Sequence, residues 1–332
     1  MKILFITKYF YPHIGGVEKH IEEVSGRLIK KGHQVTVLTF KHDQQSLEIE
    51  TRGGIKIIRI PYLNSKFSTW KNIINQKNLI QQAGIVHIHD IFFTYLPLRF
   101  IFPLKPTYIT FHGWEGEFPI PLKNIFIRKL SEKLTKGNIC IGDYIKKWYK
   151  TKPDFVTYGG CTVSRHQLHN SKNITQITFI GRLEEVNSIK EYLEALTMLK
   201  QQHNFKITFV GDGSYKKQAQ KLGKVTGMVK GIDKYLKKPS FIFASSYLTI
   251  LEAMVAGLPV FALYTNPLKK DYLKLFSGAE FINISSSVDE LTKQVKNSLQ
   301  RHALKVKKGQ SFAKKQTWDK VTNIYLQLWK KN

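Results

Sequence analysis

The chain has 332 residues, twice the ~150 residues of a common domain, which favours two globular domains. Hydrophobic residues make up 42% and charged residues 23%, so sizeable cores can form and a mainly disordered or fibrous protein is excluded. Lysine and arginine number 52 against 24 aspartates and glutamates, which gives a formal net charge of +28. This surplus favours an anionic partner: nucleic acid, anionic lipid, polyanionic glycan or a phosphorylated substrate.

Several features bear on cellular location. Cys140 and Cys161 are too few for a disulfide framework, and the sequence has no zinc-type spacing of cysteine and histidine, so we expect no metal and a reducing, cytoplasmic setting. The apolar N-terminal run is too short for a signal peptide. The most apolar stretch, 91–104, is interrupted by two prolines and an arginine and falls short of the ~20 residues of a spanning helix. We expect a soluble protein, or one bound only peripherally to the inner face of the cell membrane.

The first half alternates strands with helices. Lys2–Thr7 is a short apolar run typical of a buried parallel strand, and Val17–Lys31 carries apolar residues at helical spacing. Gly32 ends that helix. Further strands are predicted at Gln34–Phe40, Ile55–Ile60, Ile85–His89 and Thr107–Phe111. Strands that alternate with helices imply right-handed crossovers and a parallel sheet.

A polar, glycine-led linker is predicted at 159–173, after which the pattern restarts. The predicted strands are Gln176–Ile180, Lys206–Val210, Phe241–Ala244 and Leu258–Ala262. The predicted helices are Ile189–Gln201, Tyr215–Leu222, Thr249–Val255, Val288–Leu299 and Val321–Trp329. The chain is therefore predicted as α/β, with parallel-sheet domains at 1–160 and 161–315 and a closing helix within 316–332 that packs back on the first domain.

Ligands of open α/β sheets bind beyond the carboxyl ends of the strands, so the site should lie in loops that follow strands. Gly15 and Gly16 precede the first helix, whose N-terminal N–H groups favour a phosphate, although a plain tight turn explains them equally well. His112 follows a strand directly and can hydrogen-bond a polar ligand; a surface histidine without a function is the simpler explanation. His87 and His89 point to one face of a strand and mimic a metal pair, but structural polar residues at a strand end are commoner.

The second half offers three further candidates after its strands. Arg182 carries a permanent charge that can grip two phosphate oxygens at once, which indicates an anion. Gly211 and Gly213 predict a backbone turn close to a ligand. Glu252 lies in an otherwise apolar helix, where a carboxylate is costly unless it accepts hydrogen bonds, for example from vicinal hydroxyls.

Taken in order, these motifs resemble the GT-B glycosyltransferases of family 4, the group 1 type. The matching stretches are KYFYPHIGGVE at 8–18, TFHG at 110–113, FIGRL at 179–183, FVGDG at 209–213 and LEAMVAGLPV at 251–260. Trp318 and Tyr325 are similar to residues of the family's closing helix. The resemblance implies two Rossmann-like domains that face a central cleft, the first for the acceptor and the second for a nucleotide-sugar donor. It further implies retaining transfer of a hexose to a hydroxyl of a glycan or lipid-linked acceptor, with no obligatory cofactor or metal.

The same resemblance implies roles for single residues. As catalytic residues it implies His112 at the transferred sugar, Arg182 at the diphosphate and Glu252 at the ribose hydroxyls. The residues implied to bind the donor are Gly15, Gly16, Arg182, Gly211, Gly213, Leu248, Thr249 and Glu252. Of these, Leu248 and Thr249 would act through amides at a helix start, where the dipole favours phosphate.

Two positions depart from the family pattern. The lysine expected five residues after the arginine is Asn187, and the first of two paired glutamates is Ala244. Loss of a cation at the leaving group removes several kcal/mol of transition-state stabilisation unless another cation replaces it. Lys190, Lys216 and Lys269 are candidates for that replacement. The alternative function is a catalytically weakened GT-B-fold protein that binds a nucleotide or glycan.

Basic residues concentrate in two stretches, Lys123–Lys152 and Lys296–Lys331. Apolar residues recur every four positions in the first, at Leu122, Phe126, Leu130 and Leu134. This spacing predicts an amphipathic basic helix suited to an anionic membrane surface, while an ordinary solvated face is the alternative. A polyanion-binding module is a third possibility, but no recognition motif or stacking aromatic pattern accompanies the charge, so we expect no specific nucleic acid partner.

Overall fold

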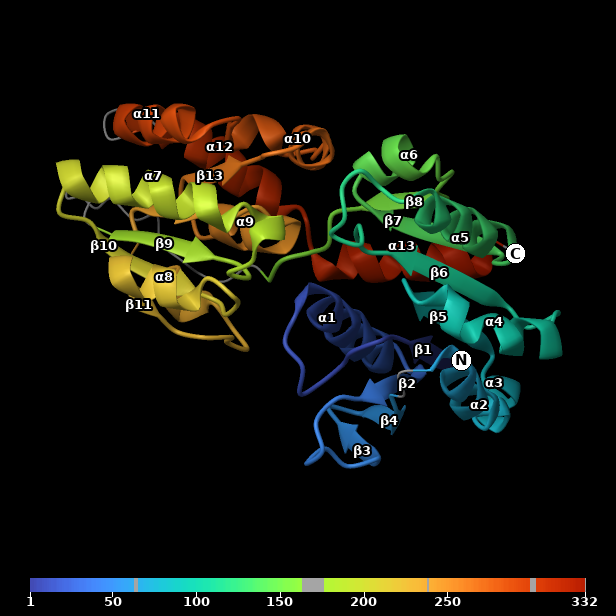
Figure 1. Cartoon of the computed structure of the whole chain (residues 1–332). Helices are drawn as coiled ribbons and strands as arrows, with labels where there is room; N and C mark the ends of the chain where they lie inside the picture. The colour runs from blue at the N-terminus through green and yellow to red at the C-terminus, as the bar shows by residue number, and fades with distance from the viewer. Residues whose placement is uncertain (63–64, 163–175, 238, 299–302, 332) are drawn as a thin grey trace. The chain divides into compact units, whose positions relative to one another are not determined.

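The computed structural model describes residues 1–62, 65–162, 176–237, 239–298 and 303–331 (Figure 1). The chain divides into two compact units, one made of Met1–Thr157 with Trp318–Asn332 and the other of Tyr158–Thr317. Each unit holds its own mostly parallel sheet with helices packed on it, so the predicted α/β class is confirmed.

The sheet of the first unit has eight strands. They are β1 (Lys2–Ile6), β2 (Gln34–Lys41), β3 (Ile49–Arg52), β4 (Ile55–Pro61), β5 (Ile85–His89), β6 (Thr107–Phe111), β7 (Gly137–Ile141) and β8 (Phe155–Thr157). Their order is β3-β4-β2-β1-β5-β6-β7-β8, and every pair is parallel except β3 with β4. β5, β6 and β7 are buried along their whole length, as expected for the centre of a covered parallel sheet.

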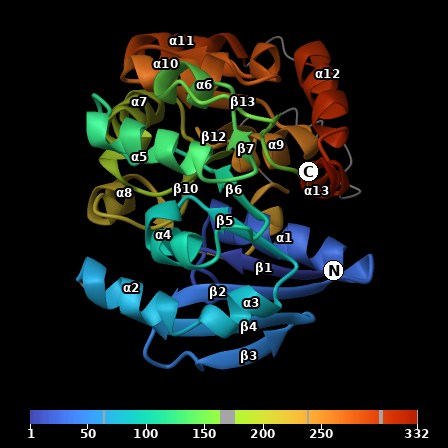
Figure 2. The same cartoon turned by 90° about the vertical axis from the view of Figure 1, so that its right-hand side faces the viewer.

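The described residues of this unit form seven helices. They are α1 (Gly16–Lys30), α2 (Lys66–Ile74), α3 (Lys77–Gln82), α4 (Phe92–Ile101), α5 (Leu122–Lys133), α6 (Tyr144–Tyr149) and α13 (Trp318–Lys330). Helices α2, α4 and α5 lie in a row, as Figure 2 shows. Helix α13 packs against α1 and β8 and buries Trp318, Tyr325 and Trp329, so the end of the chain completes the first unit.

The sheet of the second unit has six strands. They are β9 (Gln176–Ile180), β10 (Lys206–Val210), β11 (Lys224–Val225), β12 (Phe241–Phe243), β13 (Val260–Leu263) and β14 (Asn283–Ser285). All pairs are parallel in the order β11-β10-β9-β12-β13-β14. Aromatic side chains of four strands, Phe179, Phe209, Phe243 and Phe261, pack in the core of this unit.

The helices of the second unit surround that sheet. They are α7 (Ile189–Gln202), α8 (Lys216–Leu222), α9 (Tyr247–Val255), α10 (Pro267–Lys274), α11 (Val288–Ser298) and α12 (Ala303–Lys314). The described residues of this unit also form three short 3-10 turns, η1 (Glu185–Asn187) before α7, η2 (Asp233–Tyr235) between β11 and β12, and η3 (Ala279–Phe281) before β14.

Several predictions from the sequence need correction. The helix that the spacing from Leu122 to Leu134 predicts is α5, and the rest of the basic stretch Lys123–Lys152 forms β7, α6 and the loops around them. Helix α9 begins at Tyr247 rather than Thr249, and β13 begins at Val260 rather than Leu258. Most of the predicted linker at 159–173 lies outside the described residues.

Candidate active site

His112 lies in the first unit, directly after β6, and three contacts fix its position. Its Nε2 lies 2.8 Å from Nδ1 of His89, and its backbone N–H donates to Oδ1 of Asp90 at 2.8 Å. Asp90 adopts a left-handed backbone (φ 62°) at the end of β5, which turns its carboxylate toward the neighbouring strand end. Arg128 of α5 donates to the carbonyl of Gly113 at 2.8 Å and holds the loop from the other side.

His112 is a neutral imidazole. Loss of water around the ring, together with the charge effect of His87, lowers the pKa of His112 to about 3, although part of the side chain reaches the surface. The pKa of His89 is also lowered well below its usual value, chiefly by burial. The Nε2 of His89 is buried without a partner among the described residues, and an unpaired acceptor there is less costly than an unpaired N–H. We therefore assign the His89 proton to Nδ1, which donates to His112 and leaves the His112 proton on Nδ1.

A directed chain of hydrogen bonds joins α13 to the strand ends. The indole of Trp329 can only donate, and it donates to Nδ1 of His87 at 3.1 Å. The proton of His87 is therefore on Nε2, 2.8 Å from the hydroxyl of Thr110. Thr110 can then donate to the Tyr325 hydroxyl at 2.9 Å, and Tyr325 donates to Nε2 of His20 at 2.9 Å. Both ring nitrogens of His87 are thus used within the fold, which favours the structural explanation over a metal pair.

Arg128 is a support of this site rather than part of a charged surface. Its side chain is buried, donates to Oε1 of Glu115 at 2.9 Å and lies 3.7 Å over the ring of Tyr149. The Tyr149 hydroxyl donates to the other oxygen of Glu115. The sequence pattern places Arg128 among the basic residues of the predicted membrane helix, and this is wrong because Arg128 faces the interior.

Gly15 and Gly16 begin α1, and Glu18, which the sequence did not single out as a site residue, lies beside them. Gly15 is the N-cap, and a Cβ there would come within 2.3 Å of Oε2 of Glu18. The Glu18 side chain is only 11% exposed and pairs with Nδ1 of His13 at 2.8 Å. The positive end of α1 therefore already has a carboxylate near it, which disfavours a phosphate there and suits a hydroxyl ligand better. The sequence did contain a signal for Glu18, because it is the fourth residue of the GGVE motif.

In the second unit, glycines let two strand-end loops touch. A Cβ at Gly211 would lie 1.9 Å from the carbonyl oxygen of Gly181, and one at Gly213 would lie 2.4 Å from that of Leu183. The Leu183 N–H donates to the Asp212 carbonyl at 2.8 Å. This close approach accounts for both glycines without a ligand, so donor contact by Gly211 and Gly213 stays a prediction.

Arg182 lies in the same loop and its side chain is exposed. Its guanidinium forms no ion pair with any residue in the described parts of the chain. Asn187, at the place of the expected lysine, donates from its side chain to the Arg182 carbonyl at 3.1 Å and so shapes the loop instead of adding charge. Ala244 is fully buried.

Helix α9 carries the remaining candidates. Leu248 and Thr249 are in its first turn, whose N-cap Ser246 makes no side-chain bond to the backbone and instead donates to the Thr249 hydroxyl at 3.0 Å. The amides of this turn are therefore not capped by Ser246. Glu252 lies one turn further along and is half-buried.

The three replacement cations differ in their surroundings. Lys190 pairs with Glu185 at 2.7 Å, and Lys216 pairs with Asp212 at 3.0 Å. Lys269, by contrast, is 5% exposed, and its Nζ lies 4.8 Å from the centre of the Tyr272 ring.

Both halves of the chain match models of protein families. The model described as Glycosyltransferase Family 4 matches residues 14–154, and the model described as Glycosyl transferases group 1 matches residues 174–298. The chain belongs to glycosyltransferase family 4. The predicted family and the prediction of an enzyme are thereby confirmed. The two family models match the N-terminal and the C-terminal part of the glycosyltransferase, respectively.

Relatives and solved structures agree with this family. An uncharacterized glycosyltransferase of Methanocaldococcus jannaschii is 25% identical to the present glycosyltransferase over 99% of each chain. The GPI3 subunit of phosphatidylinositol N-acetylglucosaminyltransferase from Saccharomyces cerevisiae is 33% identical over 26% of this chain and 21% of its own length. The structure of Anabaena HepE in complex with UDP and glucose has a TM-score of 0.79 at 14% identity and covers 100% of both chains. This likeness shows the GT-B fold.

Among the residues that the structure describes, no group of three or more histidine, cysteine, aspartate or glutamate side chains is placed to hold a metal ion. Within the same residues, no helix combines the length and apolar character needed to cross a membrane. Cys140 and Cys161 are both buried thiols, and burial raises the pKa of Cys140 to about 12.

Proposed function

We propose that this glycosyltransferase is a retaining enzyme that moves a hexose from a nucleotide diphosphate sugar to a hydroxyl of a glycan or lipid-linked acceptor. The main observation behind this proposal is made in the second unit, in the loop after β9. There Arg182 has no ion-pair partner among the described residues. A guanidinium that forms no ion pair among the described residues suits a diphosphate, and so do the first-turn N–H groups of α9, which the Ser246 side chain does not cap.

The names of similar proteins support this class of substrates. HepE of Anabaena is a structural neighbour whose structure was solved with UDP and glucose. A local match to phosphatidylinositol N-acetylglucosaminyltransferase supports a lipid-linked acceptor. In the proposal, the second unit binds the donor through Arg182, the amides of Leu248 and Thr249, and Glu252, which accepts hydrogen bonds from the ribose hydroxyls.

His112 acts in this proposal as a neutral hydrogen-bond donor. Because its Nε2 is occupied by His89, its Nδ1–H remains for a sugar hydroxyl. Because the imidazole is neutral, it can orient a sugar hydroxyl by a hydrogen bond without attracting anions to the same place. Gly15 and Gly16, with Glu18 beside them, are proposed to border the acceptor hydroxyls rather than the donor phosphates.

A transfer assay tests the proposal. Nucleotide sugars are offered singly with glycan and lipid-linked acceptors, nucleoside diphosphate release is measured, and the anomeric configuration of the product is read by NMR. We expect release that depends on acceptor, a product with the donor's configuration, and a loss of about 100-fold or more in Arg182→Ala and Glu252→Ala. Lys217→Ala, on the exposed face of α8, is the control and should keep full activity. Full activity in both site variants, or an inverted product, would contradict the proposal.

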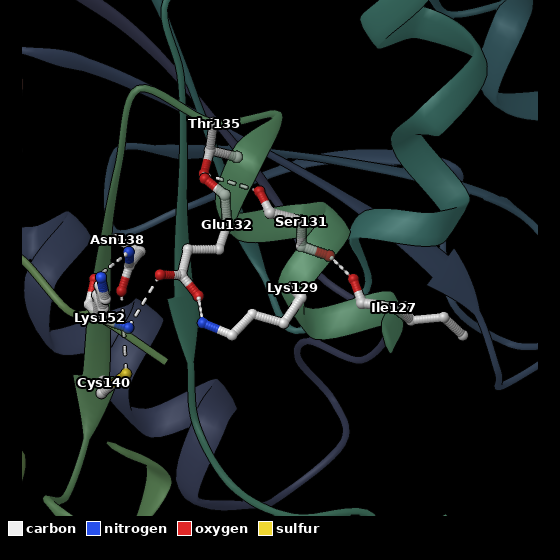
Figure 3. Close-up of polar contacts among 8 residues, drawn as sticks. All are labelled: Ile127, Lys129, Ser131, Glu132, Thr135, Asn138, Cys140 and Lys152. Carbon is white, nitrogen blue, oxygen red and sulfur yellow. Dashed lines mark hydrogen bonds and ion pairs between the residues drawn. The ribbon is translucent and has the colours of Figure 1, made fainter. Parts of the chain in front are cut away.

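We also propose that helices α4 and α5 rest on an anionic membrane surface. Leu122 and Phe126 of α5 are 82% and 68% exposed, and Phe100 and Leu104 at the end of α4 are exposed as well. The one acidic residue of α4 and α5 is Glu132, and Figure 3 shows its carboxylate between the Lys129 ammonium and the backbone N–H of Lys152. The surface therefore combines apolar side chains with lysines and leaves its single acid neutralised, which complements anionic lipid.

Vesicle sedimentation tests this surface. The double variant Leu122→Ser/Phe126→Ser should lose most of its binding to phosphatidylglycerol vesicles. Leu47→Ser/Ile49→Ser replaces two similarly exposed apolar residues elsewhere in the unit and should bind as the natural protein does. Equal binding of all three proteins, or equal binding to neutral phosphatidylcholine, would exclude the proposed surface.

A further inference from the structure

Lys269 is a largely buried lysine of the second unit. It lies in the first turn of α10, where its backbone N–H is capped by Oδ1 of Asn266 at 2.8 Å. The residue is 5% exposed. Its Nζ lies over the ring of Tyr272 on its own helix. No carboxylate or other acceptor among the described residues pairs with that Nζ, so the charge lacks a counterion there.

A second cation lies within electrostatic reach of it. Arg182 acts on Lys269 and, after burial, is the second cause that lowers the pKa of this lysine, to about 8. Two like charges are held in one region although proteins rarely bury an ammonium without a partner. Two neighbouring cations of this kind are expected at a site that binds an anion with more than one negative charge. In the free protein that anion is not bound, so the cations have no counter-charge.

The fold explains how these distant residues meet. The loop after β9 contains Arg182 and ends at Ser188, whose hydroxyl lies 3.2 Å from that of Thr265 in the loop between β13 and α10. Helix α9 joins from the strand between them, because β12 pairs with both β9 and β13. The Tyr247 N–H at the start of α9 donates to the Tyr272 hydroxyl at 3.2 Å, which ties α9 to α10.

Lys190 and Lys216, the other two candidate cations, are already paired and are not free to bind an anion. Lys190 and Lys216 are 52% and 44% exposed, and each is paired with a carboxylate of its own loop. Neither contributes to the lowered pKa of Lys269. Of the three lysines, only Lys269 is both buried and unpaired within the described part of the chain.

We infer that Lys269 supplies the second positive charge at the donor diphosphate, in place of the lysine that Asn187 replaces. This inference rests on the proposed function. In the transfer, the bond between the sugar C1 and the diphosphate oxygen breaks and its electron pair stays on that oxygen. The acceptor oxygen bonds to C1, and its proton passes to the departing diphosphate. Arg182 and Lys269 stabilise the charge that develops on that leaving group.

Titration calorimetry on the full chain tests this inference. UDP, GDP and ADP are each titrated beside the matching nucleoside, so that contacts to the diphosphate are separated from contacts to the base and ribose. Lys269→Met keeps the length of the side chain and removes the charge. We expect it to weaken binding of the preferred nucleoside diphosphate by about 10- to 100-fold and to leave nucleoside binding unchanged. Lys269→Arg should restore part of the loss, whereas a purely structural role would make arginine at this buried position worse than methionine.

Control variants separate the two levels of the proposal. Lys190→Met and Lys216→Met should bind as the natural protein does. If Arg182→Ala weakens diphosphate binding and Lys269→Met does not, the inference about Lys269 is wrong and the proposed function stands. If neither variant changes the affinity for any of the three diphosphates, the proposed function itself is contradicted.

Discussion

Two sets of polar residues, one in each unit, differ in how they are paired. In the first unit, His20, His87 and Tyr325 satisfy one another in a chain of neutral hydrogen bonds, and Arg128 has a carboxylate and a carbonyl as partners. In the second unit, Arg182 and Lys269 lack such partners among the described residues. A satisfied network stabilises the fold, whereas unpaired cations weaken it and favour an anionic ligand. Substitutions should therefore lower stability in the first unit and lower binding in the second.

The chain provides a selective probe for this contrast. All five tryptophans, at 70, 114, 148, 318 and 329, lie in the first unit and none in the second. Tryptophan fluorescence during urea unfolding therefore reports on the first unit alone.

Arg128→Met should give the largest loss of stability. The substitution removes the donor of the Gly113 carbonyl and the Glu115 carboxylate. Because Glu115 is 42% exposed, the cost comes mainly from the lost charged hydrogen bonds and the contact with the Tyr149 ring, about 2–3 kcal/mol. The urea midpoint measured by tryptophan fluorescence should fall accordingly. Lys129→Met, one residue further on the half-exposed face of α5, is the control, and an equal fall in both variants would mean that the helix rather than the network matters.

Tyr325→Phe should have an intermediate effect. It removes the hydroxyl that accepts from Thr110 and donates to His20, so two buried groups lose a partner at a cost of about 1–3 kcal/mol. The same fluorescence measurement applies. A variant as stable as the natural protein would show that the directed chain of hydrogen bonds does not hold α13 in place.

Lys269→Met should have the smallest effect on stability, and of the opposite sign. Because burial lowers the pKa of Lys269 to about 8, the folded state releases its proton before the unfolded state does, and stability rises between pH 8 and the ordinary lysine pKa. Methionine removes this pH dependence and should leave the free protein as stable or slightly more stable at pH 7. Hydrogen exchange of the β13 amides at pH 7 and pH 9 measures this. Marked destabilisation by methionine at pH 7 would contradict the claim that the ammonium is unpaired.

Sequence patterns predicted the architecture well where a single pattern, such as a continuous apolar run, identifies an element. The bounds of β5, β6, β9 and β10 were predicted correctly, since a buried parallel strand is a continuous apolar run with clear ends. Helix α10 was missed because its eight residues carry only Leu268, Tyr272 and Leu273 as apolar positions, too short a pattern for a periodicity argument.

The site was harder to predict than the fold. The bond between His20 and Tyr325 joins residues 305 positions apart, and nothing local in the sequence signals it. Arg128 was counted among the solvated basic residues of a helix whose apolar face was expected to meet lipid, and nothing local in the sequence signals that this one cation is buried. Lys269 could be named as a candidate, but its burial follows only from the packing of α9 and α10.

The most direct test of the central claim is a ladder of titrations with nucleoside, nucleoside monophosphate and nucleoside diphosphate for uracil, guanine and adenine. If unpaired cations of the second unit bind a donor diphosphate, the affinity for one of the three bases must increase from nucleoside to monophosphate and again from monophosphate to diphosphate. The second increase should be about tenfold or more. Affinities that stay flat along all three series would contradict the account.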